Sequence, residues 1–106
     1  MCARFQLAAD SQALIDAFGL PFEPGIAPRH EIFPTEPVLV VTSLHKQIVA
    51  THMRWGYTPS WSKVDLGAKL INARSETLSE RNTFRHSFAR RRCLLPATAY
   101  FEWRLE

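Results

Sequence analysis

Hydrophobic and polar positions follow a helical spacing in the first part of the chain. A capping residue, Asp10 or Ser11, precedes this pattern and Gly19 follows it, so the pattern predicts a short helix. The apolar positions of that helix are Ala13, Leu14, Ala17 and Phe18. Five prolines and a glycine then occur between residues 20 and 37. We expect an ordered loop there, because proline lacks a backbone donor and excludes both helix and central strand.

Two β-branched, apolar runs follow, at 37–42 and 47–55, and a turn at 44–46 makes them a predicted hairpin. Residues 56–68 combine proline, glycine, serine and lysine with two aromatics, and they predict a second loop. The remaining predicted elements are a strand end at 70–72, a helix over 75–88 capped near Ser75 or Thr77, and strands at 92–95 and 100–103.

The last predicted strand is strongly apolar, and nothing follows it that could cover it or pair with it. Because an exposed strand edge favours association, we expect either that the natural domain continues or that self-association with a second chain completes the sheet. The final Leu105-Glu106 pair is interpreted as a cloning-site scar, which leaves residues 1–104 as part of a single domain.

The 106 residues, 46% of them hydrophobic, suffice for one compact domain but not for two. No apolar run approaches the roughly 20 residues that cross a bilayer, and the start MCARF lacks a secretory signal. We therefore expect a cytoplasmic protein, associated with the nucleoid if bacterial, without a membrane partner. Reducing cytosol disfavours a disulfide between Cys2 and Cys93, and Cys93 is predicted to be a small, buried hydrophobic residue. The histidines lack a metal-binding spacing with the cysteines, so we predict no zinc site and no cofactor.

Charge is unevenly distributed along the chain. Up to Met53 three basic residues stand against five acidic ones, whereas from Arg54 onward ten stand against five. The net charge of +3 therefore combines −2 in the first half with +5 in the second. Such a distribution is expected when one face binds phosphates, because each neutralised phosphate releases counterions. A solvated basic surface is the alternative.

Cys2 is the first candidate for chemistry, because removal of Met1 would leave an α-amine and a thiol on one residue. Both groups are partly nucleophilic near neutral pH. The amine can condense with an aldehyde to an imine, and the adjacent sulfur can then close a five-membered thiazolidine, which no internal cysteine can do. The alternative is that Cys2 is only a small residue near a disordered terminus.

Three later segments strengthen the case for Cys2, because they follow it in a specific order. They are WGYTPSW at 55–61, INARSET at 71–77, and RRCLLPA at 91–97 with YFEW at 100–103, while MCARF opens the chain and GIAP occupies 25–28. This ordered set resembles the SOS response-associated peptidase (SRAP) domain family. The resemblance runs from residue 1 to 104 and covers about the first half of the family's domain.

The resemblance implies an α+β fold, with a mixed, mostly antiparallel, β-barrel-like sheet and short helices, incomplete at the C-terminus. It also implies a positively charged cleft for single-stranded DNA. SRAP proteins act in the SOS response to DNA damage. They remove the leading methionine by autoproteolysis, as a cysteine peptidase, and bond the exposed cysteine to the aldehyde of an abasic site. The implied partner is single-stranded DNA with abasic sites, and the implied activities are crosslinking and a lyase-like reaction.

Carried over residue by residue, the resemblance makes Cys2 the nucleophile. Asn72 would hold the N-terminus or the reacting sugar by hydrogen bonds, and Glu102 would act as acid or base at the deoxyribose and the amine. Imine formation needs both kinds of proton transfer, and a carboxyl group held among aromatic residues suits that task. The alternatives are a turn residue at Asn72 and a solvent-facing strand residue at Glu102.

The residues expected to contact DNA are Arg4, Arg74, Trp61 and Pro28. The two arginines lie within two residues of a proposed catalytic group and could clamp phosphates, or could instead form structural salt bridges. A tryptophan can stack on an unpaired base, although Trp55 at the hairpin end is better explained as a core residue. The run 90–92 of three arginines is better explained as a solvated surface.

Two departures from the family pattern qualify the resemblance. Position 3 is Ala where the family usually has Gly, and none of the four histidines lies in the H-x-R-x-P-type segment that carries a catalytic histidine in the family's second half. The competing hypothesis is therefore a non-catalytic protein that binds single-stranded DNA. A third hypothesis is a general N-terminal-nucleophile peptidase. The basic second half disfavours it, because basic residues favour phosphate over peptide.

Overall fold

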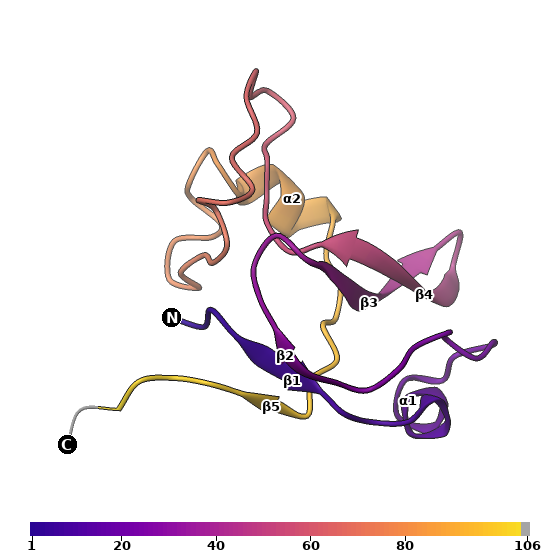
Figure 1. The fold of residues 1–106 in the computed structure, drawn as a ribbon. Helices are drawn as coiled ribbons and strands as arrows, with labels where there is room; N and C mark the ends of the chain where they lie inside the picture. Colours follow the sequence, from indigo (N-terminus) through magenta and orange to yellow (C-terminus); the bar gives the residue numbers. More distant parts are fainter. Residues whose placement is uncertain (105–106) are drawn as a thin grey trace.

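A computed structural model describes residues 1–104 of the chain, and the Leu105-Glu106 pair interpreted as a cloning scar lies outside the described residues. The elements are strands β1, β2, β3, β4 and β5 and helices α1 and α2 (Figure 1). In chain order they are β1 (Phe5–Leu7), α1 (Ser11–Phe18), β2 (Arg29–Ile32), β3 (Pro37–Leu44), β4 (Gln47–Arg54), α2 (Arg85–Arg90) and β5 (Ala99–Tyr100).

Helix α1 begins and ends as its sequence predicts. The Asp10 side chain accepts a hydrogen bond from the Ala13 N–H at 2.8 Å, and Gly19 ends the helix in the left-handed conformation with φ 65°. The buried position is Leu14, whereas Ala13 and Ala17 are exposed. The predicted apolar face was therefore right at Leu14 and wrong at the two alanines.

The proline-rich segment 20–37 is not wholly loop, because β2 forms between Pro28 and Pro34. β2 lies at the edge of a three-stranded antiparallel sheet with the strand order β2-β1-β5. Prolines that flank an edge strand remove no hydrogen bond from a sheet interior. The prediction that excluded a central strand holds, and the prediction of uninterrupted loop was wrong.

Strands β3 and β4 form the predicted hairpin, in register from Pro37 opposite Arg54 to Leu44 opposite Gln47. The turn residues His45 and Lys46 have positive φ angles of 50° and 65°. Positive φ at both central residues defines a type I′ turn, which matches the twist of the strands but favours Asn-Gly. The hairpin therefore forms despite local strain at its tip.

The strain at the hairpin tip gives a test of stability. Replacing Lys46 with glycine removes left-handed strain of about 1–2 kcal/mol and costs somewhat less in chain entropy, so we expect a net stabilisation of about 0.5 kcal/mol. The measurement is the urea midpoint of unfolding. Lys63→Gly, at a position without positive φ, is the matched control and should not stabilise the protein.

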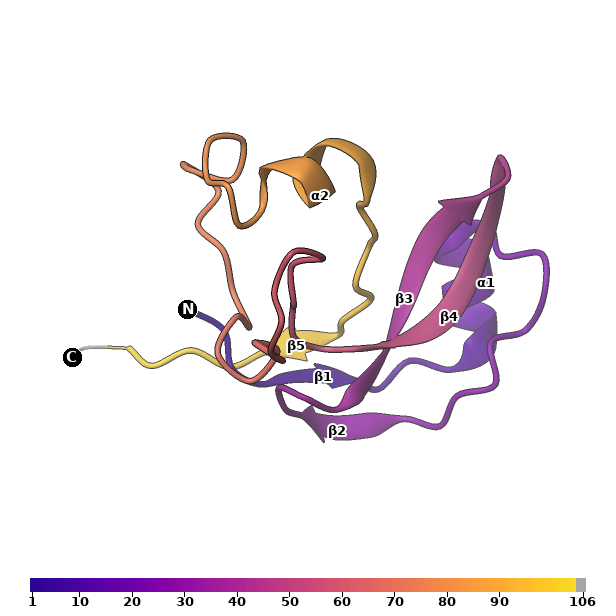
Figure 2. The same ribbon diagram turned by 90° about the horizontal axis from the view of Figure 1, so that it is seen from above.

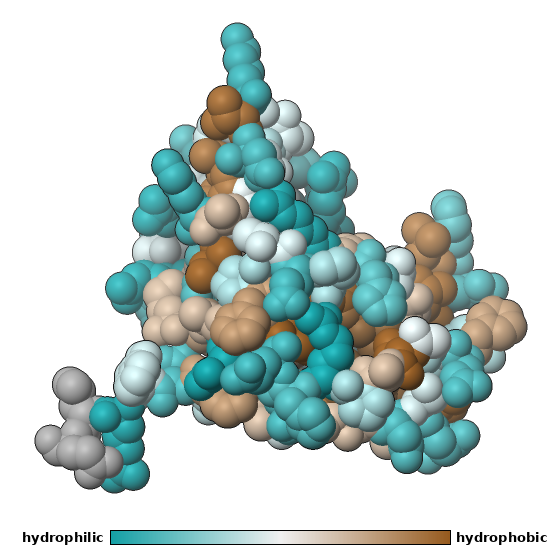
Figure 3. All heavy atoms as spheres, in the orientation of Figure 1, coloured by the Kyte–Doolittle hydropathy of each residue, from teal (hydrophilic) through white to brown (hydrophobic). Residues whose placement is uncertain are grey.

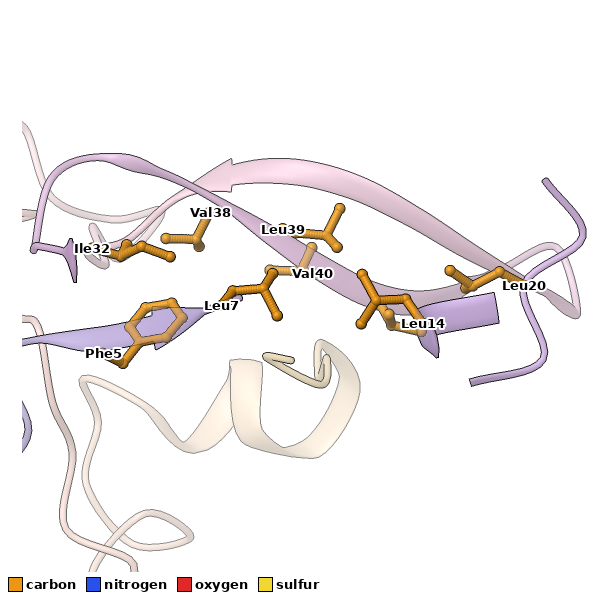
Figure 4. Packing of buried hydrophobic residues seen from close by; sticks show 9 residues of the cluster. Phe5, Leu7, Leu14, Leu20, Ile32, Val38, Leu39 and Val40 are labelled. Carbon is orange, nitrogen blue, oxygen red and sulfur yellow. The ribbon is translucent and has the colours of Figure 1, made fainter. Parts of the chain in front are cut away.

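The core lies between the β3–β4 hairpin and the three-stranded sheet (Figure 4). All four residues of the run 38–41 in β3 are buried, because both faces of this strand are covered. The other core residues come from β1, β2, α1 and the residue after it: Phe5, Leu7, Ile32, Leu14 and Leu20. Within the described residues the two sheets stay separate and no closed barrel forms, so the barrel-like part of the expected fold is not confirmed.

Several predicted elements of the second half are shorter than expected or absent. Residues 70–72 are not a strand, and the helix predicted over 75–88 is reduced to turns followed by the six-residue α2. The strand predicted at 92–95 makes one bridge, between Leu94 and Val41, and of the strand predicted at 100–103 only Tyr100 lies in β5. Cys93 is exposed, so the prediction that it is buried was wrong.

Candidate functional site

The register of β1 against β5 brings the start and the end of the chain together. Phe5 pairs with Tyr100 and Gln6 with Ala99, and the Phe101 N–H donates to the Arg4 carbonyl at 3.1 Å. Continuing this antiparallel register places Glu102 beside Ala3. The Glu102 carboxylate accordingly lies 3.5 Å from the Met1 α-amine.

Asn72 contacts the same terminal segment from another part of the chain. Its side-chain amide donates a 2.7 Å hydrogen bond to the Cys2 carbonyl oxygen. The structure thus gathers three predicted site residues, Cys2, Asn72 and Glu102, around the first peptide units. Asn72 bonds to Cys2 itself, whereas Glu102 contacts the amine of the methionine that precedes it.

Trp55 fixes the position of Asn72, a role that the sequence did not indicate. Its indole N–H donates to the Ile71 carbonyl at 2.9 Å, and its ring packs edge-on against Phe5 with centroids 5.4 Å apart. The Tyr57 N–H donates to the Leu70 carbonyl at 2.9 Å. A continuous set of contacts therefore links β1 to the segment that carries Asn72. The interpretation of Trp55 as a core residue agrees with its half-buried position.

The Cys2 side chain is half-buried, and its thiol donates to the Arg4 carbonyl at 3.3 Å. A thiol is a weak donor, so breaking this contact to reach an electrophile costs little. The terminal segment is held by contacts, because Asn72 bonds to the Cys2 carbonyl and β1, in the middle of its sheet, begins three residues after Cys2.

The terminal segment lies beside two hollows. One has a volume of about 510 Å³ and contains Glu102 as the only acidic residue of its lining, and we call it the terminal hollow. Its lining residues are Met1, Ala3, Arg4, Phe33, Tyr100, Phe101, Glu102 and Trp103. The other has a volume of about 520 Å³ and includes Asn72 in its lining, and we call it the apolar cleft. Cys2 lines neither hollow and packs partly against the core, whereas its neighbours Met1 and Ala3 line the terminal hollow with Glu102.

The four residues predicted to contact DNA are not gathered in one place by any contact among the described residues. Arg4 pairs with Glu31 at 3.2 Å and stacks over the Phe101 ring at 4.2 Å. It therefore forms a structural salt bridge, which was the alternative to a phosphate clamp. Arg74, Trp61 and Pro28 are exposed, and Trp61 keeps 64% of its surface accessible. Trp61 belongs to the loop 56–68, which rises to the top of Figure 1 after β4.

A carboxylate at the base of this loop organises its backbone. Asp65 accepts hydrogen bonds from the Gly67 N–H at 2.8 Å, from Arg54 at 2.8 Å and from the Thr58 hydroxyl at 3.1 Å. These donors, Gly67 foremost, hold the pKa of Asp65 below its ordinary value of 3.8. The hydrogen bonds tie Thr58, near the start of the loop that carries Trp61, to Asp65 and Gly67 near its end.

The lowered pKa of Asp65 predicts how the loop responds to acid. A carboxyl group whose folded-state pKa is depressed stabilises the fold above 3.8, and that contribution is lost as the pH falls through the folded-state value. The chemical shift of the Gly67 amide should therefore titrate with a midpoint below 3.8. A midpoint at or above 3.8 would show that the Gly67 bond does not form in solution.

Among residues 1–104 no group of three His, Cys, Asp or Glu side chains could hold a metal ion. In the same part of the chain no helix has the length and apolar character needed to cross a membrane.

Comparison with known proteins identifies the family. The family model described as "SOS response associated peptidase (SRAP)" matches residues 1–106. The chain belongs to the SRAP family. No solved structure matches the chain significantly.

Curated SRAP relatives carry names that refer to abasic sites. Abasic site processing protein YoqW of Bacillus subtilis is 35% identical over 109 residues, which cover 98% of this chain and 48% of the relative. YoaM of the same organism is 33% identical over 108 residues, with the same coverage. HMCES of Gallus gallus is 33% identical over 60 residues, 52% of this chain and 18% of the relative. The chain spans about half the length of the bacterial relatives it matches.

Proposed function

We propose that this SRAP chain captures abasic sites in single-stranded DNA by forming a thiazolidine between Cys2 and the sugar aldehyde, after Met1 has been removed. The observation that carries the proposal is the convergence on the N-terminus of Asn72, bonded to the Cys2 carbonyl at 2.7 Å, and Glu102, 3.5 Å from the Met1 amine. The names of YoqW, YoaM and HMCES support abasic-site processing as the process.

Removal of Met1 is the first step. The Cys2 thiol adds to the Met1 carbonyl, the Cys2 nitrogen leaves as an amine that takes up a proton, and water hydrolyses the resulting thioester to free methionine and the thiol. Asn72 holds the backbone of Cys2 during this exchange. Glu102 anchors the amine that leaves with methionine and becomes free to meet the new one.

Capture of the aldehyde is the second step. The Cys2 amine adds to the aldehyde carbon, and loss of one water gives an imine. The thiol then adds across the imine, with sulfur bonding to carbon and the proton passing to nitrogen. Glu102 is the acid that protonates the departing hydroxyl and the base that takes the amine proton, because it is the only carboxyl group lining the terminal hollow.

Binding of the flanking nucleotides is assigned to exposed side chains outside the terminal hollow. Arg74 follows Asn72 by two residues and has no ion-pair partner among residues 1–104, so its guanidinium is open to a phosphate. The exposed indole of Trp61 offers a surface on which an unpaired base can stack. Arg4 joins them only if phosphate displaces Glu31.

The test is the intact mass of the chain after incubation with a single-stranded oligonucleotide that contains one abasic site. We expect the mass of the oligonucleotide plus that of the chain without Met1, less one water, and no requirement for borohydride. An oligonucleotide with a tetrahydrofuran analogue, which lacks the aldehyde, is the matched control. Non-covalent binding without any adduct would contradict the proposal and support the non-catalytic DNA-binding hypothesis.

The role of Glu102 gives a separate prediction. Glu102→Gln keeps the shape of the side chain but removes proton transfer and the charge opposite the terminal amine. We expect the rate of adduct formation to fall by about a hundredfold or more, with the same final product. The measurement is the single-turnover rate, with Glu80→Gln as the control at an exposed position outside the hollow. An unchanged rate would make Glu102 a solvent-facing strand residue.

A further inference from the structure

Arg4 lines the terminal hollow two residues after Cys2. The Phe101 N–H donates to the Arg4 carbonyl at 3.1 Å, so the Arg4 backbone continues the pairing of β1 with β5. Among the described residues that line this hollow, Arg4 carries the only basic side chain. Its guanidinium is therefore the cation placed to meet a phosphate beside a sugar that Cys2 captures.

Two neighbouring segments hold the Arg4 side chain. Figure 2 shows β1 between β2 and β5, and Arg4 has one partner on each side. On the side of β2, the Glu31 carboxylate accepts a 3.2 Å hydrogen bond from the guanidinium. On the side of β5, the centroid of the Phe101 ring lies 4.2 Å from the guanidinium carbon. The ring leaves the positive charge open to an anion, whereas the carboxylate neutralises it.

Glu31 has no other role in the contacts of the described chain. Within residues 1–104 its carboxylate forms no ion pair except that with Arg4 and accepts no other side-chain hydrogen bond. It does not line the terminal hollow. In Figure 3, hydrophilic residues reach the surface beside hydrophobic ones around the two chain ends. The consequence of the Glu31 contact is therefore that the cation of the hollow is occupied.

We infer that Glu31 is a specificity-determining residue, whose carboxylate competes with DNA phosphate for Arg4 and weakens non-covalent binding of undamaged single-stranded DNA. The inference rests on the proposed function, because it takes single-stranded DNA as the partner. A phosphate at Arg4 replaces one anion by another, so this contact neutralises no additional charge and releases no counterion. The displaced carboxylate stays on the neighbouring strand, where it repels the phosphate, because salt screens charges only beyond about 10 Å.

Weak binding of undamaged DNA improves discrimination. An abasic site is held by a covalent bond, so its capture needs only a brief encounter, whereas undamaged DNA is held by phosphate and base contacts alone. A lower non-covalent affinity therefore shortens the time spent on undamaged DNA and leaves the final adduct unchanged. Glu31 thus acts against the competing DNA and not on the reaction with the lesion.

Two other roles of Glu31 fit the contacts less well. If Glu31 oriented Arg4 toward phosphate, its removal would weaken binding, but the Phe101 ring and the paired backbone already restrain Arg4. If the ion pair mainly stabilised the fold, its side chains would be buried, whereas they are 41% and 56% exposed. Competition with phosphate requires neither orientation nor burial.

The experiment measures the Kd for an undamaged single-stranded oligonucleotide by fluorescence anisotropy at several salt concentrations. Glu31→Gln keeps the shape of the side chain and removes its charge. We expect its Kd to be roughly fivefold lower than that of the parent at low salt. The slope of the logarithm of the binding constant against the logarithm of salt concentration should become more negative by about 0.7, because one more phosphate is neutralised.

Glu23→Gln is the matched control for the loss of one negative charge. Glu23 is exposed and forms no ion pair among residues 1–104, so this variant should change the Kd by less than about twofold. Arg4→Ala tests the route of the effect, because in its background Glu31→Gln should no longer tighten binding. Thermal unfolding of each variant shows whether the change in Kd reflects an altered fold.

Four outcomes would overturn the inference. They are an unchanged or higher Kd of Glu31→Gln, an unchanged salt slope, an equal gain in the Arg4→Ala background, and no binding of the oligonucleotide by either parent or variant. The oligonucleotide carries no aldehyde, so adduct formation with abasic DNA is a separate measurement. An adduct without any effect of Glu31→Gln would leave the proposed function standing, and tighter binding without any adduct would leave the role of Glu31 standing.

Discussion

Cys2→Ser is expected to abolish the borohydride-independent adduct with abasic single-stranded DNA. Serine retains an α-amine once Met1 is removed, so an imine can still form, but the hydroxyl is a poor nucleophile for closing the ring. The imine hydrolyses when the DNA is denatured unless borohydride reduces it. The measurement compares intact masses with and without borohydride for both proteins. A stable adduct of Cys2→Ser at the parental yield without borohydride would contradict the proposed function.

The N-terminal mass of the same variant separates two uses of the thiol. If Met1 is retained in Cys2→Ser and removed from the parent, the thiol is needed for processing as well as for capture. If Met1 is removed from both proteins, the thiol is needed only for ring closure. Cys93→Ser is the control for a general effect of cysteine loss, because Cys93 is exposed and free and lies outside the terminal hollow.

Gly56→Ala is expected to cause the largest loss of stability among the substitutions considered. Gly56 has φ 145°, and a Cβ atom there would lie 2.3 Å from the Gly67 carbonyl oxygen. Both partners are backbone, so relief requires moving the loop away from the end of β4. Backbone strain and overpacking together should cost about 4 kcal/mol of unfolding free energy. The measurement is equilibrium unfolding in urea.

Two other glycines provide a graded control for this prediction. Gly25 has open space where an added methyl group would lie and no positive φ, so Gly25→Ala should change stability by less than about 0.5 kcal/mol. Gly19 also has open space but a φ of 65°, so Gly19→Ala should cost about 1 kcal/mol from conformation alone. Equal effects at Gly56 and Gly19 would show that the close approach to Gly67 is absent.

Local sequence signals predicted the elements that are stabilised locally. Helix α1 is specified by its cap at Asp10 and its end at Gly19. The β3–β4 hairpin is specified by two apolar runs around a short turn. Neither element needs help from distant residues. β1 went unpredicted because three residues, FQL, carry no periodic signal. The helix expected over 75–88 lacked a continuous apolar stripe, and most of that segment forms turns. The structure of these regions depends on packing and pairing with segments that are distant in the sequence.

The candidate site was predictable by residue type and motif but not by geometry. The resemblance to SRAP domains nominated Cys2, Asn72 and Glu102, which the structure brings to one terminus. The supporting contacts of Trp55 with Phe5 and Ile71 depend on how the hairpin packs on β1, and no local pattern encodes this packing. The roles assigned to Cys2 and Glu102 stay predictions until the kinetics of their variants are measured.

The pairing of β1 with β5 also sets an order of events during synthesis. Cys2 leaves the ribosome first, whereas the residues that complete its surroundings follow about a hundred positions later, as the hydrogen bond from the Thr98 hydroxyl to the Gln6 carbonyl illustrates. Bringing such distant segments together carries a loop-closure cost that local elements do not pay. A nascent chain therefore carries the Cys2 thiol while about a hundred further residues are added before Glu102, and any maturation that requires this carboxylate cannot begin earlier.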